Sequence, residues 1–236
     1  MRRWLSVVCL IGLLGTTSLA MGQSLVTRYV PGEDYRVVES APQRDADKPV
    51  QVTEFFLYTC PHCYHFDPEL AKWVKAHPNI RFERVPVLFG QGGASYARLY
   101  YTEEALGVTD RLHEAIFTAI HEQGQLLATR PAQRKFMIEH GVDGKAFDKA
   151  YDSEAVEAKI RSVATRMKRF QVTAVPSLSV GEQYWVSGRL AGDNDRMLDV
   201  VDYLIEQTRD GGGPDGSLVE RVYGDPPLRY FLFDLA

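Results

Sequence analysis

The chain has 236 residues, of which 45% are hydrophobic and 25% are charged. This length and composition allow one sizeable core, so we expect one globular unit. The formal net charge is -4, and the Lys and Arg residues are scattered rather than gathered into runs, which argues against a nucleic-acid partner.

The N-terminal segment has the features of a secretory signal peptide. Arg2 and Arg3 precede an apolar run over residues 4–14, and small residues follow. The alternative is a membrane anchor, but this run is well short of the roughly 20 residues that span a bilayer. We therefore predict a signal peptide over residues 1–22 that is cleaved on export.

The cysteines point to chemistry rather than to structural bridges. Cys9 leaves with the predicted signal, so the exported protein keeps Cys60 and Cys63 in a compartment where disulfides persist. A single pair that closes so small a loop removes little entropy from the unfolded chain. The pair is therefore better suited to catalysis than to stabilisation.

The segment around these cysteines is predicted as a strand followed by a helix. Residues Val50–Tyr58 are rich in β-branched and aromatic side chains, as in a buried strand, and lead directly to Cys60. Pro61 is well placed to begin a helix, because the N–H that it lacks has no partner there anyway. Apolar residues then recur at helical spacing until Pro78.

The other predicted elements complete an α/β order of strand, helix, strand, helical block, hairpin and helix. Residues 94–170 show no strong strand signal and carry helical patterns separated by glycines, which indicates a helical insertion. The other elements are an edge strand at Tyr35–Glu39, a strand at Arg81–Phe89, a hairpin of Ser177–Val180 with Tyr184–Ser187, and a closing helix at Asp193–Thr208. Residues 210–236 form a tail of unknown role.

The motif Cys60-Pro61-His62-Cys63 lies where the predicted strand gives way to the helix. Unpaired N–H groups and the helix dipole favour a negative charge on Cys60, and His62 can add positive charge or a hydrogen bond. Only the reduced protein carries the thiolate, so stabilising it makes the disulfide more oxidising. The sequence thus predicts a dithiol pair that accepts electrons.

The predicted reaction is dithiol–disulfide exchange. A substrate thiolate attacks the Cys60–Cys63 disulfide at Cys60, and a second substrate thiol then displaces Cys60 from the mixed disulfide. Cys63 lies deeper in the predicted helix and is the less accessible sulfur. The alternative is an inert structural bridge.

Metal or haem binding is a competing interpretation, because His62 and His65 add imidazole ligands to the two thiols. Structural zinc sites typically use two ligand pairs that are apart in sequence, and the second pair is missing. Haem attachment needs a histidine where Tyr64 stands. We therefore expect no metal and no cofactor.

Glu54 interrupts an otherwise apolar strand shortly before the cysteines. This position predicts a buried carboxyl group near Cys63 that exchanges protons as the thiol is released. The alternative is an edge position with the carboxylate in water. His65 is interpreted as an exposed helix residue, and no partner is identified for His77, His113, His121 or His140.

Several of these residues resemble the DsbA family of periplasmic thiol oxidases. The resemblance covers about residues 25–209 and rests on Phe55-Phe56, Cys60-Pro61-His62-Cys63-Tyr64, Phe66 and Val175-Pro176. A lowered pKa of the first cysteine is an established property of that family, so it is not a new prediction.

The resemblance implies a thioredoxin-like α/β fold with an inserted helical subdomain. Residues 23–93 and 171–209 would form the thioredoxin-like domain and residues 94–170 the insertion. Glu54 would be the family's buried glutamate. The Val175–Pro176 bond would be cis and face the cysteines, with the Val175 backbone free to pair with an extended substrate. Without the resemblance we would expect a trans bond, because only about 5–6% of X–Pro bonds in folded proteins are cis.

The function implied is a periplasmic oxidase that introduces disulfides into reduced exported polypeptides and is recharged by a membrane quinone-linked oxidase like DsbB. One alternative is an isomerase or reductase of the same fold. Isomerases of this class carry an N-terminal dimerisation domain, for which the segment before Val50 is too short, so we expect a monomer. A second alternative is a redox-inactive chaperone-like module that binds unfolded chains.

Overall fold

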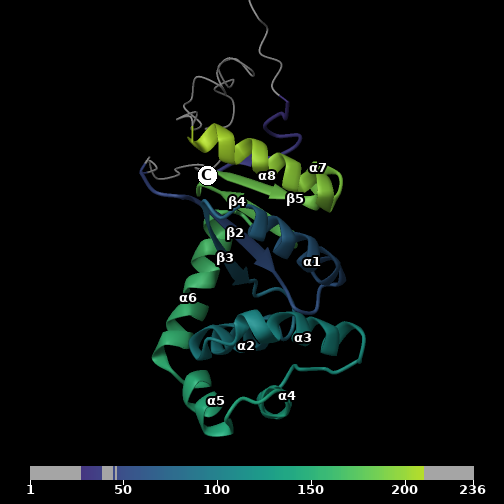
Figure 1. The fold of residues 1–236 in the computed structure, drawn as a ribbon, viewed down its shortest axis with the longest axis vertical. Coiled ribbons are helices and arrows are strands. Elements are labelled where there is room, and N and C mark those ends of the chain that lie inside the picture. The colour runs from purple at the N-terminus through teal and green to yellow at the C-terminus, as the bar shows by residue number, and fades with distance from the viewer. Residues whose placement is uncertain (1–27, 39–44, 46, 210–236) are drawn as a thin grey trace, which may run out of the picture.

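The computed structural model describes residues 28–38, 45 and 47–209, and the predicted signal peptide and C-terminal tail lie outside them. Its strands form one sheet in the order β1-β5-β4-β2-β3 (Figure 1). Strands β2 and β3 are parallel, and the other neighbours are antiparallel. The strands are β1 (Arg36–Val37), β2 (Val50–Phe56), β3 (Ile80–Pro86), β4 (Ser177–Val180) and β5 (Tyr184–Ser187). The helices are α1 (Pro61–Ala76), α2 (Gly93–Leu106), α3 (Thr109–His121), α4 (Arg130–Glu139), α5 (Gly144–Tyr151), α6 (Glu154–Arg169), α7 (Gly188–Ala191) and α8 (Asn194–Arg209).

One face of the sheet packs against α1 and α8. Alternate β2 residues such as Val50 and Val52 point into this core, where they meet Phe66 and Leu70 of α1 and Val200 of α8. A stripe of apolar side chains at helical spacing puts each helix on this face. Because α1 begins just after β2, this packing fixes the helix start at the end of the central strand.

Helices α2 to α6 interrupt the chain between β3 and β4, and α6 returns to the other face of the sheet (Figure 1). The ring of Phe170, at the end of α6, lies 5.3 Å from that of Phe55 on β2. Phe56 packs edge-on against Tyr100 of α2 and also against Phe117 of α3. The insertion therefore shares a continuous apolar core with the end of β2 that leads to the cysteines.

The element order predicted from the sequence is confirmed, with shifts at several ends. The hairpin strands have the predicted bounds, but β2 ends at Phe56 rather than Tyr58, because the next residues form a turn. β3 ends at Pro86 rather than Phe89. The edge strand is reduced to two residues, and Glu39 lies outside the described part. Helix α7 was not predicted.

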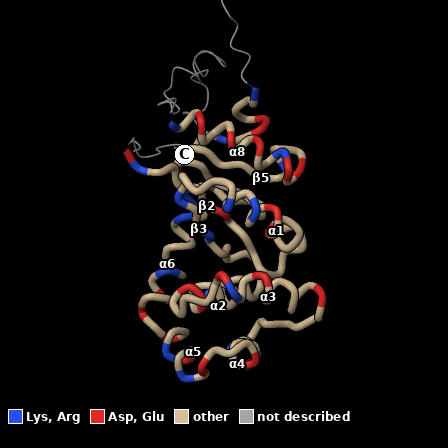
Figure 2. The backbone as a smooth tube through the Cα atoms, in the orientation of Figure 1, with Lys and Arg blue, Asp and Glu red and all other residues tan. Residues whose placement is uncertain are grey.

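Charged residues of both signs are interspersed along the described chain (Figure 2). Within the described residues, no helix combines the length and apolar character that a membrane span needs.

Candidate active site

The two cysteines lie at the junction of β2 and α1. The Cys60 N–H donates to the Leu57 carbonyl at 2.9 Å, which closes the turn after the strand. Cys60 is the N-cap residue of α1, and Pro61 is the first helical residue, as predicted. Cys63 follows one turn later and is fully buried, whereas Cys60 is half-buried; both are free thiols.

The start of the helix stabilises a Cys60 thiolate. A hydrogen bond from the Cys63 thiol lowers the pKa of Cys60 to about 6, against the opposing effect of partial burial. Backbone N–H groups of Cys63 and His62 and the charge of the His62 ring act in the same direction. This agrees with the role that the sequence predicts for a helix N-terminus.

The interior holds Cys63 as a thiol. Burial raises its pKa well above the ordinary value, and the nearby charges of Cys60 and Glu54 add to this effect. The pKa values of the two thiols are therefore shifted in opposite directions, although the cysteines are only three residues apart. The surroundings thus favour the thiolate at Cys60 and the thiol at Cys63.

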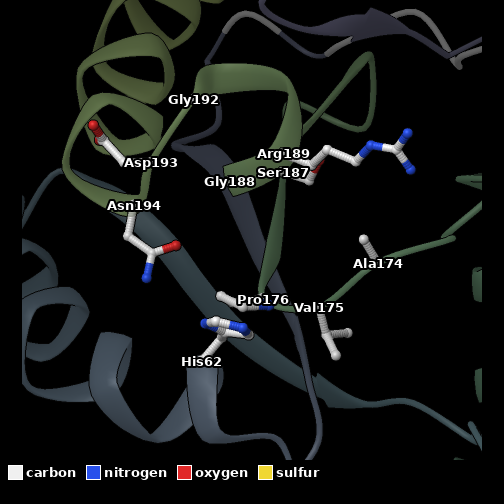
Figure 3. A pocket seen from close by; sticks show the side chains of 10 residues that line it. All are labelled: His62, Ala174, Val175, Pro176, Ser187, Gly188, Arg189, Gly192, Asp193 and Asn194. Atoms are coloured by element: carbon white, nitrogen blue, oxygen red, sulfur yellow. The ribbon is translucent and has the colours of Figure 1, made fainter.

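The Val175–Pro176 peptide bond is cis and faces Cys60, as the resemblance implied. The Cys60 thiol lies 3.7 Å from the Val175 carbonyl oxygen. An open groove of about 410 Å³ begins here and runs between His62, the Val175–Pro176 loop, α7 and the start of α8 (Figure 3). In this view the His62 ring lies beside Pro176, and the Arg189 side chain extends from the opposite wall.

Glu54 is buried, as predicted, and its position is set by the sheet. It is paired in register with Arg84 on the parallel neighbour β3, so the two side chains lie side by side. The Arg84 Nε donates to Glu54 Oε2 at 2.8 Å. Burial nevertheless raises the pKa of Glu54 to about 7, with the Asp67 charge adding to the rise and Arg84 opposing it.

Three residues of this site were missed from the sequence. Arg84 Nη2 also donates to Asp67 Oδ1 at 2.9 Å, and His113 Nε2 lies 3.2 Å from the same oxygen. Asp67 comes four positions after Cys63, where the helix predicts the same buried face, and this spacing was the available signal. The signal for Arg84 was a charge in a predicted strand. His113 gave none, because its partners are distant in sequence.

The two histidines in and just after the cysteine motif lie at the surface. His62 and His65 are both exposed, as predicted for His65. Among the described residues, no group of three or more His, Cys, Asp or Glu side chains is placed to hold a metal ion.

Comparison with known proteins identifies the family. The sequence model of the DSBA-like thioredoxin domain matches residues 92–204. The chain is 36% identical over 202 residues to the thiol:disulfide interchange protein DsbA of Burkholderia cepacia, which covers 84% of this chain and 95% of the relative. The chain belongs to the DsbA family.

Other DsbA proteins give the same result. The DsbA of Azotobacter vinelandii is 40% identical over 161 residues, covering 68% of this chain and 75% of the relative. The crystal structure of Pseudomonas aeruginosa DsbA matches with a TM-score of 0.73 at 32% identity, covering 78% of this chain and 96% of that one. The protein is therefore a thiol:disulfide oxidoreductase with a thioredoxin-like fold and a helical insertion.

Proposed function

We propose that Cys60 and Cys63 are the redox-active pair and that the protein uses their disulfide to oxidise the thiols of exported polypeptides. The observation that carries this proposal is the contrast between the two sulfurs. Cys60 favours the thiolate and Cys63 is held as a buried thiol. Stabilising a thiolate that exists only in the reduced form drives the dithiol–disulfide equilibrium toward the reduced form, which makes the disulfide an oxidant.

The proposed reaction has two exchanges. A substrate thiolate attacks Cys60, the S–S bond breaks, and its electron pair goes to Cys63, which takes a proton from Glu54. A second substrate thiolate then attacks the substrate sulfur of the mixed disulfide, and Cys60 leaves as a thiolate. The substrate dithiol is oxidised and the protein disulfide is reduced, so electrons balance.

The cis loop supports a substrate site beside the sulfurs. The Val175 carbonyl lies at Cys60, and Val175 and Pro176 line the groove that begins there. An extended substrate segment would pair with the Val175 backbone, and the groove would receive its neighbouring side chains.

The cellular setting is part of the proposal. The signal peptide predicted over residues 1–22 supports export to the periplasm, where the protein would act as a monomer and a membrane quinone-linked oxidase like DsbB would restore its disulfide. We also propose the division into a thioredoxin-like domain of residues 23–93 and 171–209 and a helical insertion of residues 94–170.

The deciding experiment is the redox potential of the Cys60–Cys63 pair. The protein is equilibrated in glutathione buffers and the free thiols are counted after alkylation. We expect a potential well above that of the glutathione pool. A value near or below about -270 mV, where thioredoxin lies, would show a reductant instead. Replacing Cys60 with Ser separates both from a redox-inactive chaperone, whose activity would survive.

A further inference from the structure

A row of buried polar side chains extends from the dithiol into the helical insertion. It begins at Glu54, passes through Arg84, Asp67 and His113, and reaches Tyr58, whose hydroxyl lies 2.8 Å from His113 Nδ1. These residues come from β2, β3, α1, α3 and the turn before α1. Burying polar groups costs free energy unless they are paired. A row of this length therefore requires a physical reason.

The first feature of this row is how Arg84 divides its donors. Nε and Nη2 form one edge of the guanidinium, and this edge matches the two oxygens of a single carboxylate in a bidentate pair. Here Nε donates to Glu54 at 2.8 Å and Nη2 donates to Asp67 at 2.9 Å. Asp67 therefore takes half of the pairing that would otherwise hold Glu54 firmly as a carboxylate.

The second feature is how His113 holds Asp67. Both Arg84 Nη2 and His113 Nε2 approach the same oxygen, Oδ1. His113 Nε2 lies 3.2 Å from this oxygen without forming a well-aligned hydrogen bond, and in the buried site the electrostatic contact between the two groups is still strong. Burial favours the neutral acid, but His113 and Arg84 together lower the pKa of Asp67.

Tyr58 and Glu103 hold the other side of the His113 ring. Both carboxyl oxygens of Glu103 lie 3.0 Å from the Tyr58 hydroxyl, and burial raises the pKa of Glu103 well above its usual range. The Tyr58 hydroxyl donates to the Glu103 carboxyl group and also contacts His113 Nδ1 at 2.8 Å. These contacts orient the ring so that Nε2 faces Asp67 at 3.2 Å.

We propose that Asp67, held by His113, is a positioning residue that keeps Arg84 shared between two buried carboxyl groups and so leaves Glu54 free to carry the proton that Cys63 takes up. This inference rests on the proposed function and assigns a role to two residues outside the cysteine motif. Asp67 touches neither sulfur nor substrate, and it acts through Arg84 and Glu54.

The charged and titratable groups around Glu54 give the direction of the effect. Arg84 faces it from β3, and Asp67 and Cys63 face it from α1. Arg84 also interacts electrostatically with Tyr100 of α2. The Asp67 charge raises the pKa of Glu54, whereas Arg84 lowers it. Removing only the Asp67 charge therefore lowers the pKa of Glu54.

The test replaces Asp67 with Asn in the full-length protein. An amide keeps the oxygen that accepts from Arg84 and faces His113, but it removes the charge. The Glu54 carboxyl is titrated by carbon-13 NMR, and the signal that disappears in Glu54→Gln identifies it. Glu69→Gln is the matched control, because Glu69 is an exposed acid two residues later on the same helix.

In Asp67→Asn we expect the Glu54 midpoint to move from about 7 to lower pH by about one unit or more. The protonated fraction at pH 7 then falls from about half to about one tenth, so reduction of the disulfide by a model dithiol slows roughly fivefold. Glu69→Gln should leave both unchanged. An unmoved midpoint, or an equal shift in the control, would overturn the proposal.

His113→Phe provides a second measurement if Asp67→Asn does not fold. It removes the contact that holds Asp67, and the Glu54 midpoint should move in the same direction by a smaller amount. A midpoint that stays in place would count against the proposal. All comparisons are made with the wild-type protein in one assay, so they do not depend on whether its potential is that of an oxidase or a reductant.

Discussion

The exposed start of α1 and the buried face of the same helix lie one turn apart and have opposite effects on a thiol. At the start, the Cys63 thiol and backbone N–H groups lower the pKa of Cys60 to about 6. On the buried face, loss of solvent raises the pKa of Cys63 well above normal. One residue type thus takes two chemical roles because the fold places it in two environments.

The comparison also shows which partners each region needs. The exposed start uses helix N–H groups and a neighbouring imidazole, all within four residues of sequence. On the buried face, the neighbours are Glu54, whose charge acts on Cys63, and its partner Arg84, and these two come from two strands. A thiolate in partial contact with water is stabilised locally, whereas a buried thiol depends on groups that only the tertiary fold brings together.

The largest expected effect comes from separating the two sulfurs. Cys60→Ser and Cys63→Ser should both abolish disulfide formation in a reduced substrate. Only Cys63→Ser keeps a thiol that reacts rapidly, so at pH 7 its alkylation by iodoacetamide should exceed that of Cys60→Ser by about a hundredfold or more. Mass spectrometry of timed samples measures the rates. Equal rates would contradict the contrast between the sulfurs.

The pH dependence of stability should show the same contrast. The pKa of Cys60 is about 6 in the folded, reduced protein and about 8.5 in an unfolded chain. Folding therefore releases a proton between these values, so the stabilisation of the reduced form is lost as pH falls through 6 and is greatest near 8.5. Above this, Cys63 acts in the opposite direction, because only its unfolded form ionises.

This prediction is checked by urea unfolding of the reduced and oxidised proteins at pH 5, 7 and 8. The stability of the reduced form relative to the oxidised form should increase at each step. The oxidised protein serves as the control, since it has no titrating thiol and shares the other ionisable groups. A difference that does not change with pH would contradict the lowered pKa of Cys60.

A smaller effect is expected from His62→Ala at the exposed start. Loss of the imidazole raises the pKa of Cys60 and makes the disulfide a weaker oxidant, by up to about tenfold in the equilibrium constant with glutathione. His65→Ala is the matched control, because His65 is also exposed and lies on the same helix. If both variants shift the equilibrium equally, His62 has no special role.

Most of the fold could be predicted because its signals are local. The hairpin strands and the helix after Cys60 follow from residue patterns within each segment. Strand ends were less certain, since the apolar residues Leu57 and Tyr58 continue the strand pattern while the backbone already turns toward Cys60. The four-residue helix α7 is too short to show a periodic pattern.

The active site divides in the same way. Cys60, His62 and Cys63 lie within four residues of sequence, and a strand-to-helix junction suffices to place them. Glu54 could be found as a lone acid in an apolar strand, but its partner Arg84 is identified only through strand register. The contact between Asp67 and His113 joins α1 to the helical insertion across 46 positions of sequence, a distance over which composition and periodicity carry no information.

The smallest effect is expected far from the sulfurs, and it separates stability from redox chemistry. Ser153 caps α6, and its hydroxyl accepts a hydrogen bond from the Val156 N–H at 3.3 Å. Ser153→Ala should lower the free energy of unfolding by about 1 kcal/mol, because that N–H loses its partner.

The Ser153→Ala effect should be equal in the oxidised and reduced proteins, since the cap contacts neither cysteine, and the redox potential should not change. Urea unfolding of both forms, with the potential measured in glutathione buffers, tests this. A shifted potential would mean that the insertion is coupled to the dithiol through its general stability. An unchanged potential would show that the stability of the insertion can change without altering the dithiol.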